Sequence, residues 1–262
     1  MKFRHLFMCL SLCAGGLAGC FGGGHAEWED PRYATMMEAA DSVFRLGYVR
    51  QAQQQYQAAL DRAFLIDDPR AIHDAGFNLA TSELRLKDYR NSLTTLDRVS
   101  AALTTRGWTG EQQADLHLVR ASVLYAQKYW QDVESEAVLA RNSTDGSVRS
   151  KAYALTGLAA VELSDRATLE DAINHLTASK KLSNPTDLQE LLVRRSMMDQ
   201  TWSQAVDEAR KLVSSREEEM DYEAMRRALL LEARALQAAG QQGAADDVMR
   251  RFTDSEKAQA GQ

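Results

Sequence analysis

The side chains of this 262-residue chain that could do chemistry are few and far apart in the sequence. The histidines beyond the first twenty positions are His25, His73, His117 and His175, and no two of them have the helical spacing of a metal site. The sequence contains no HExxH or GxSxG motif and no glycine-rich phosphate loop. We expect His73 and His175 on the surface and His117 packed beside its own helical hairpin. These residues predict no catalytic centre, no cofactor and no bound metal.

The thiol of Cys20 is the reactive group that the sequence marks most clearly. Lys2 and Arg4 precede an apolar run at 6–12, and small apolar residues at 13–19 lead to the cysteine. This order of basic start, apolar run and small-residue zone is typical of a secretory signal peptide. About 12 apolar residues form a helix of roughly 18 Å, which is too short for a bilayer core of about 30 Å. The pattern predicts a cleaved signal peptide over residues 1–19.

The four residues Leu17-Ala18-Gly19-Cys20 resemble the lipobox of bacterial lipoproteins. The resemblance implies that the Cys20 sulfur carries a diacylglyceryl group, that cleavage falls directly before Cys20, and that the new amine receives a fatty acid such as palmitate. Phe21 stands where lipoproteins retained in the inner membrane tend to have Asp, which implies the periplasmic side of the outer membrane. Residues 20–30 would then be a flexible tether of at most about 33 Å. The alternative is ordinary secretion, with Cys20 incidental.

Composition indicates the fold class and argues against one kind of partner. Apolar residues make up 45% of the chain and charged residues 26%, which is typical of soluble globular proteins. Helix-favouring Ala, Leu, Gln, Arg and Glu dominate, so the chain is predicted to be all-α. The formal net charge of −6 argues against a nucleic-acid partner. Cys9 and Cys13 lie in the segment to be removed, so we expect no disulfide in the mature chain.

One pattern of small residues recurs six times along the chain. In each copy two mostly small residues lie 12 positions apart (15 in the fourth copy), and a third position follows after seven. Two helices approach closely only where both present small side chains. The pattern therefore predicts six αα-hairpins with a period of 36 to 41 residues. The three positions of each copy are Ala40, Ala52 and Ala59; Ala80, Ser92 and Val99; Ala121, Val133 and Ala140; Gly157, Ala172 and Ser179; Val193, Ala205 and Leu212; and Ala233, Ala245 and Phe252.

The first copy resembles the tetratricopeptide repeat. The resemblance rests on the spacing of Ala40, Gly47, Ala52, Tyr56 and Ala59, and the repeats cover 31–252. It implies a right-handed α-solenoid of about six hairpins, with the first helix of each hairpin lining a concave face. HEAT-type repeats, whose period is about 40 residues, are the rival interpretation.

Helix boundaries are marked locally. Each of the three prolines follows a capping residue, in Asp30-Pro31, Asp68-Pro69 and Asn184-Pro185, and such pairs begin helices. A capping box at Thr109–Gln112 opens the third hairpin. We expect a disordered tail at 253–262. The predicted helices are 31–46, 49–65, 69–86, 89–104, 110–127, 130–141, 146–163, 169–181, 185–199, 202–217, 221–239 and 242–252, with no break large enough to divide them into domains.

A candidate partner groove follows from the resemblance, because family positions on the first helices point to the concave face. Mixed apolar and hydrogen-bonding groups there suit an extended peptide or a partner helix. The alternative is that the aromatic side chains only pack between helices. Trp108 is either an exposed anchor or part of the loop packing. The groove residues are Phe77, Asn78, Thr81, Arg85, Ser122 and Tyr125.

Two charged residues, Glu83 and Arg120, fall at positions that are usually apolar in this repeat. Either they form an ion pair between adjacent first helices, or each reaches solvent independently.

The sequence thus predicts an outer-membrane-anchored periplasmic scaffold that is not an enzyme. Its partner would be another envelope protein or peptide, in assembly, secretion, pilus or cell-wall machinery. The alternatives are a lipoprotein that binds peptidoglycan or another glycan, and a structural lipoprotein that associates with itself.

Overall fold

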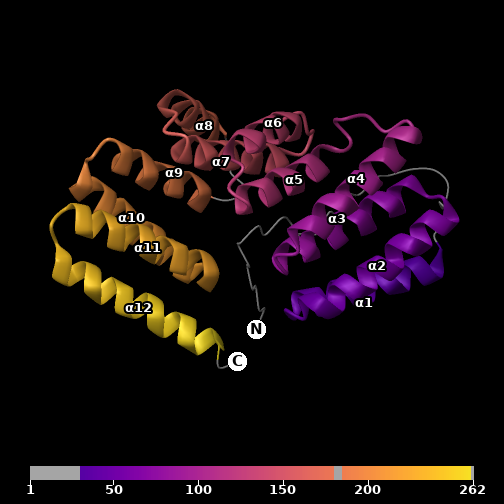
Figure 1. The fold of residues 1–262 in the computed structure, drawn as a ribbon, viewed down its shortest axis with the longest axis horizontal. Coiled ribbons are helices and arrows are strands. Elements are labelled where there is room, and N and C mark those ends of the chain that lie inside the picture. Colours follow the sequence, from indigo (N-terminus) through magenta and orange to yellow (C-terminus); the bar gives the residue numbers. More distant parts are fainter. Residues whose placement is uncertain (1–29, 180–184, 261–262) are drawn as a thin grey trace. The chain divides into compact units, whose positions relative to one another are not determined.

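A computed structural model describes residues 30–179 and 185–260, and all regular structure within them is helical (Figure 1). The predicted all-α class is confirmed. The signal peptide, Cys20 and the tether up to residue 29 lie outside the described residues. No helix in the described part is both long enough and apolar enough to cross a membrane. The helices are α1 (Pro31–Arg45), α2 (Val49–Ile66), α3 (Pro69–Arg85), α4 (Tyr89–Thr105), α5 (Ala114–Ala126), α6 (Trp130–Ala140), α7 (Gly146–Glu162), α8 (Arg166–Ala178), α9 (Pro185–Met198), α10 (Trp202–Glu218), α11 (Tyr222–Ala238) and α12 (Gln242–Ala260).

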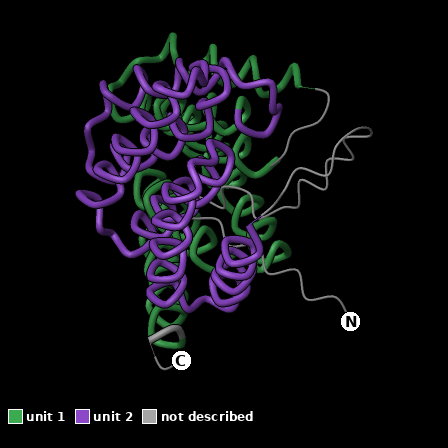
Figure 2. The backbone as a smooth tube through the Cα atoms, turned by 90° about the vertical axis from the view of Figure 1, so that its right-hand side faces the viewer, with its two compact units in different colours: residues 1–11, 149–262 green, residues 12–148 purple. Residues whose placement is uncertain are grey.

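The helices divide into two compact units, whereas the sequence predicts one repeat domain over 31–252 (Figure 2). The described part of unit 2 comprises residues 30–148 and contains α1 to α6. The described part of unit 1 begins at Arg149, in the first turn of α7, and contains the remaining helices. Each unit therefore holds three of the predicted hairpins.

Aspartates at helix starts confirm the boundaries that the prolines mark. The Asp30 carboxylate accepts hydrogen bonds from the backbone N–H groups of Arg32 (3.1 Å) and Tyr33 (2.8 Å) at the start of α1. Asp68 caps α3 in the same way, and a proline follows each aspartate in the first helical position. Asn184, the third predicted cap, lies outside the described residues.

The predicted capping box forms, but it does not begin the helix. The Gln112 side chain accepts from the Thr109 N–H (2.9 Å), and the Thr109 hydroxyl accepts from the Gln112 N–H (3.4 Å). Residues 110–113 form turns, and α5 begins only at Ala114.

Each hairpin turn contains one residue in the left-handed conformation. In the first turn the Gly47 N–H donates to the Phe44 carbonyl and the Tyr48 N–H to the Val43 carbonyl, both at 3.0 Å. These paired bonds satisfy the last carbonyls of α1 and close the helix. The equivalent residues are Gly47, Lys87, Lys128, Ser164, Gln200 and Gly240, with φ between 58° and 88°. Four of the six are not glycine, so their backbone adopts a conformation that glycine adopts at a lower cost in free energy.

The paired positions of the small-residue pattern are buried in all six hairpins, and the predicted register is confirmed in every hairpin but the fourth. In the second hairpin the Ser92 hydroxyl donates to the Ala80 carbonyl at 2.8 Å, so α3 and α4 touch directly at this pair. The third positions are buried in four hairpins, half-buried at Phe252 and exposed at Ser179.

The exposed Ser179 reflects a shift of the fourth hairpin. The second helix is predicted over 169–181, but α8 begins at Arg166, because the Asp165 carboxylate caps it by accepting from the Thr168 N–H at 3.1 Å. Leu169, 12 residues after Gly157, is fully buried, and so is Leu176 seven residues later. The 12-plus-7 spacing therefore holds in this hairpin too, with leucines in place of the expected small residues.

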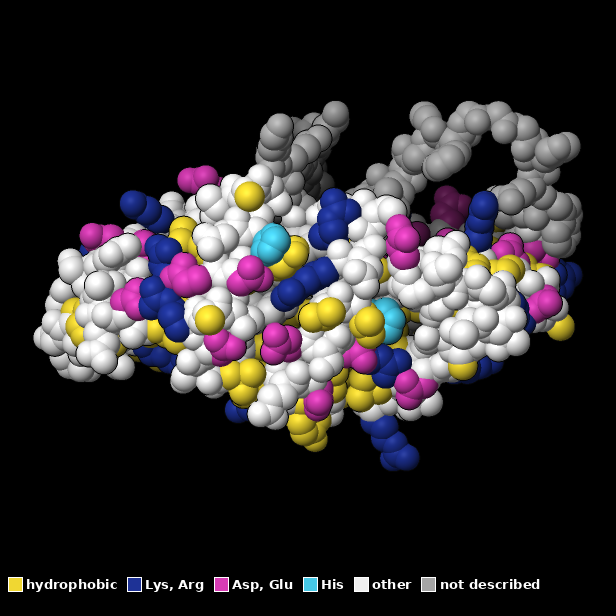
Figure 3. All heavy atoms as spheres, turned by 90° about the horizontal axis from the view of Figure 1, so that it is seen from above, with side chains coloured by type: hydrophobic (Ala, Val, Ile, Leu, Met, Phe, Trp, Pro, Cys, Tyr) yellow, Lys and Arg dark blue, Asp and Glu magenta, His cyan; other side chains and the backbone are white. Residues whose placement is uncertain are grey.

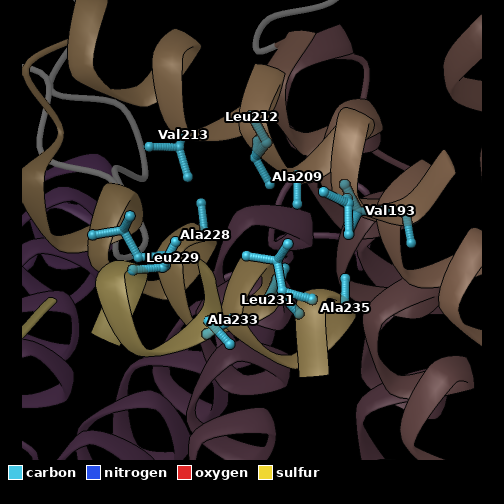
Figure 4. Close-up of a cluster of buried hydrophobic side chains, with 14 of the residues drawn as sticks. Val193, Ala209, Leu212, Val213, Ala228, Leu229, Leu231, Ala233 and Ala235 are labelled. Carbon is cyan, nitrogen blue, oxygen red and sulfur yellow. The ribbon is translucent and has the colours of Figure 1, made fainter. Parts of the chain in front are cut away.

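Gly157 lies where three helices of unit 1 approach one another closely. A Cβ atom at this position would lie 2.6 Å from Leu191 Cδ1 of α9 and 3.1 Å from the Ala172 Cβ of α8. Only a glycine lets the three helices pack at this distance. Further along, small and branched side chains of α9, α10 and α11 point into a common interior (Figure 4), among them Val193, Ala209 and Leu231.

The predicted disordered tail is wrong for residues 253–260. Helix α12 continues to Ala260, two turns beyond Phe252. Its Val248 is buried and its Phe252 is half-buried, while Asp246, Asp247 and Arg250 are exposed. The last helix therefore presents a polar outer face, as the end of a repeat array requires for solubility.

Candidate functional site

The candidate site is the first-helix face of unit 2, which we define by Phe44, Phe77, Asn78, Arg85 and Tyr125. Helix α5 packs directly against α3, so the first helices of the second and third hairpins lie side by side, as the resemblance implies. The Arg85 guanidinium lies over the Phe44 ring, 4.7 Å from its centroid. The Tyr125 ring lies 4.9 Å from that of Trp130. These side chains are half-buried, so each combines packing with an exposed edge.

Two predicted groove residues, Thr81 and Ser122, do not lie on this face. Thr81 is 3% exposed and Ser122 is 2% exposed. Their hydroxyls donate to the carbonyls of Phe77 (2.8 Å) and Leu118 (2.7 Å) in their own helices. Both side chains therefore belong to the interhelix packing, in contrast to the prediction, because a hydroxyl bonded one turn back leaves its methyl or Cβ free to pack.

His73 is held between two carboxylates, whereas the sequence predicts a surface position. Its Nδ1 lies 2.8 Å from Asp74 Oδ1 and its Nε2 lies 3.0 Å from Asp115 Oδ1. Burial alone would lower the pKa of His73, but the hydrogen bonds and charges of Asp115 and Asp74 outweigh it and raise the pKa to about 9. The imidazole is therefore a cation at neutral pH, and it links α3 to α5.

Trp108 packs over this cation. Of the two predictions for Trp108, an exposed anchor or part of the loop packing, the structure therefore shows the second. The Trp108 ring centroid lies 5.0 Å from that of His73, and the Phe77 ring lies 6.4 Å away on nearly parallel planes. The other two histidines agree with their predictions. His117 bonds Glu136 across the α5–α6 hairpin at 2.7 Å, and His175 is about half-exposed.

The proposed ion pair of Glu83 and Arg120 does not form. Arg120 instead pairs with Asp97 at 2.6 Å and lies 3.8 Å from Glu136. Glu83 is 4% exposed and accepts a hydrogen bond from the Thr95 hydroxyl at 2.9 Å. Each side chain therefore has a partner on the second helix of a hairpin. The prediction compared only the first helices, so it could not reveal these partners.

A buried ionic network lies in unit 1. Arg216 is 2% exposed, and its guanidinium lies 3.3 Å from both Asp187 and Glu219. Burial raises the pKa of Asp187 despite the attraction of Arg216 and Lys151. Breaking such a network strands a buried charge, so we expect it to hold α9 and α10 in register.

A second part of this network lies on the first helices of unit 1. Arg194 binds Glu190 at 2.8 Å and approaches Glu162 at 3.5 Å. Burial would raise the pKa of Glu190, but the Arg194 and Arg227 charges lower it overall. Because the carboxylates neutralise the cations, this region is no preformed anion site.

Sequence reasoning missed Arg216, which is the buried centre of this network. Glu217 and Glu218 are exposed, whereas Glu219 binds Arg216. The signal was present, since Arg216 lies seven residues after Ala209 and four after Leu212, on the buried stripe of α10.

No three side chains of metal-binding type come together within residues 30–179 and 185–260. On the face drawn in Figure 3, acidic and basic side chains are interspersed with apolar ones. The lipid-attachment residue predicted at Cys20 lies outside the described residues.

Neither a protein-family model nor a curated protein matches the sequence. Among solved structures, a tetratricopeptide repeat protein from Parabacteroides merdae ATCC 43184 is similar, with a TM-score of 0.57. The similarity covers 85% of this chain and 79% of that chain at 14% sequence identity. The chain thus has the fold of tetratricopeptide-type helical hairpins, which favours this repeat over the HEAT type.

Proposed function

We propose that this chain is a scaffold that binds another protein of the bacterial envelope through the first-helix face of unit 2. The observation that carries the proposal is the array of helical hairpins itself, because stacked hairpins create extended surfaces that such proteins use for binding. This face carries a guanidinium over an aromatic ring, at Arg85 and Phe44, and the half-buried ring of Phe77 on the same helix as Arg85. Arginine and aromatic side chains are the types that dominate binding energy at protein interfaces.

The charged His73 stabilises the arrangement of the helices that form this face. Its bond to Asp115 ties α3 to the start of α5, and the Trp108 ring packs on it from the loop before α5. Asp74 and Phe77, on α3 itself, hold the imidazole in place. A preorganised surface loses less conformational entropy when a partner binds. The proposed ligand is an extended segment or a helix of the partner, laid along the first helices.

The same proposal includes the membrane. The lipobox-like residues ending at Cys20 support a lipid anchor, and Phe21 supports the outer membrane over the inner one. Several acyl chains on one residue give stable anchoring, unlike a single chain. The scaffold would then be held on the periplasmic side, within tether length of its envelope partner.

Affinity purification from detergent-solubilised envelopes tests the proposal. The full chain is compared with a face variant, Phe77→Ala with Arg85→Ala, and with a control variant, Val138→Ala with Leu139→Ala, whose residues are 46% and 43% exposed on α6. Loss of two anchor residues is expected to reduce the recovered partner at least about tenfold, since about 1.4 kcal/mol corresponds to a factor of ten. Circular dichroism confirms that both variants fold. Equal recovery with all three proteins would contradict a binding role for this face.

A further inference from the structure

A second surface of unit 2 lies along the turns that close its three hairpins. We name the residues 42–52, 82–92 and 123–133 the hairpin edge. Consecutive helices of the unit pack antiparallel, so these three turns follow one another along the same edge (Figure 1). The Arg85 guanidinium over the Phe44 ring places the first two turns directly beside each other.

Large apolar side chains protrude from this edge. Leu46 is 72% exposed and Tyr48 is 62% exposed in the first turn, and Tyr129 is 54% exposed in the third. Turns are ordinarily polar, and an apolar side chain at a turn tip contributes nothing to the core. Nothing in the packing of unit 2 explains why these three positions are apolar.

The hairpin edge is also basic, although the chain as a whole carries a net charge of −6. Of its three acids, Glu83 is buried and Asp88 caps α4 by accepting from the Asn91 N–H. That leaves Asp132 as the one exposed acid within these ranges, against six cations of which five are exposed and Arg85 is half-buried. The cations are Arg45, Arg50, Arg85, Lys87, Arg90 and Lys128.

Two of these cations occupy positions where a positive charge destabilises the fold. Arg50 and Arg90 occupy the second positions of α2 and α4, where the positive end of the helix dipole disfavours a cation. Both are exposed, as are Lys87 and Lys128, and none of the four takes part in an ion pair among the described residues. Helix stability therefore does not account for them, whereas an anionic ligand does.

We propose that the hairpin edge docks on a membrane surface that contains anionic phospholipid. The exposed tyrosines and Leu46 would enter the interfacial layer while the cations pair with lipid phosphates, as amphipathic and juxtamembrane segments do. Side chains that protrude from turn tips suit a soft interface. An acidic protein partner would instead seat its anchors in pockets. The hairpin edge shares Phe44, Arg85 and Tyr125 with the first-helix face. The side chains that carry this proposal lie outside that face, and the contact needs no lipid on Cys20. They are Leu46, Tyr48, Tyr129, Arg50, Lys87, Arg90 and Lys128.

The test uses a reporter on the edge itself, so that an amino-terminal anchor common to all variants does not obscure the result. An environment-sensitive fluorescent amino acid replaces Tyr48 in the full chain. A second protein carries it at Leu65, which is 73% exposed at the far end of α2, about 25 Å away. Emission is recorded with phosphatidylcholine vesicles and with vesicles that also contain phosphatidylglycerol.

The contact is expected to shift the emission at position 48 to the blue on anionic vesicles, with little change at position 65. Because each basic residue contributes roughly fivefold to binding at an anionic surface, neutralising four should raise the lipid concentration needed for half the shift at least about tenfold. The edge variant converts Arg50, Lys87, Arg90 and Lys128 to Gln. The matched control converts Arg32, Lys211, Arg234 and Lys257 to Gln, which are exposed and lie elsewhere.

Three results would overturn the proposal: equal shifts at positions 48 and 65, no shift at 48, or equal losses in the edge and control variants. A fourth is a response of the position-48 reporter to soluble poly-glutamate as strong as its response to the vesicles. That result would assign the hairpin edge to an acidic protein. Partner recovery in the affinity purification is unaffected by any of these outcomes, so the two proposals can fail separately.

Discussion

Replacing Glu83 with glutamine should stabilise unit 2 at neutral pH. The Glu83 carboxylate is 4% exposed, and burial, followed by the repulsion of Asp88, raises its pKa from 4.5 to about 6 against hydrogen bonds from Thr95 and Gln53. A rise of this pKa from 4.5 to about 6 corresponds to about 2 kcal/mol, which is the upper limit of the expected gain in stability. Glutamine keeps an oxygen to accept from the Thr95 hydroxyl and carries no charge.

The raised pKa of Glu83 also determines how the stability of the chain depends on pH. The folded state holds the Glu83 proton more tightly than the unfolded state, whose pKa is near 4.5. The penalty of the buried charge is therefore absent below about pH 4.5 and is fully present once the pH has risen through about 6. The wild-type chain should lose stability from this group across that window, and Glu83→Gln should not.

Urea denaturation followed by circular dichroism at pH 7.5 and pH 5.0 measures the difference. Glu83→Gln should unfold at a higher urea concentration than the wild type at pH 7.5, and the advantage should shrink at pH 5.0. Glu134→Gln, at an exposed position of α6, is the control and should change stability by less than about 0.5 kcal/mol. A Glu83→Gln variant that is less stable at pH 7.5, or whose advantage does not depend on pH, would refute the reasoning.

Four further substitutions test other parts of the account. Ala233→Leu should overpack the last hairpin and destabilise the chain by about 1–3 kcal/mol; an unchanged melting temperature would remove the assigned register. Gly157→Ala should lower the melting temperature because its methyl group would lie 2.6 Å from a neighbouring carbon, whereas Gly110→Ala, with nothing within 4 Å, should not. Gln200→Gly should stabilise by roughly 0.5–1 kcal/mol in urea denaturation, because φ is 58° there; a loss of stability would contradict the left-handed turn. Cys20→Ala should leave the chain unprocessed or unanchored, and a variant that still fractionates with outer membrane after a carbonate wash would contradict the lipobox interpretation.

The hairpin register could be predicted because its signals are local and periodic. Close helix contacts require small residues, so the sequence spacing of Ala80 and Ser92 is enough to mark a contact between α3 and α4. Asp-Pro pairs mark helix starts for an equally local reason. The predicted start of the fourth hairpin's second helix is wrong because the small Ala172 is a weaker boundary signal than the Asp165 cap that begins α8.

Side-chain partners between helices could not be read from spacing. His73 and Asp115 are 42 residues apart, and nothing in either segment shows that they meet. Several carboxylates lie within one repeat of Arg120 in the sequence. Only the orientation of α4 determines that Asp97 is the one that pairs with it. The helical end of α12 differs from the predicted tail because polar composition alone does not fray a helix, and residues 253–260 contain neither proline nor glycine.

Site-specific photocrosslinking in cells that make this protein tests whether the first-helix face of unit 2 binds another envelope protein. A photoreactive amino acid at Asn78, on the first-helix face of unit 2, is compared with one at Val138, which is 46% exposed on α6. We expect a discrete crosslinked product with another envelope protein from position 78 and none from position 138. No product from position 78, or the same product from both positions, would contradict a scaffold that binds its partner through this face.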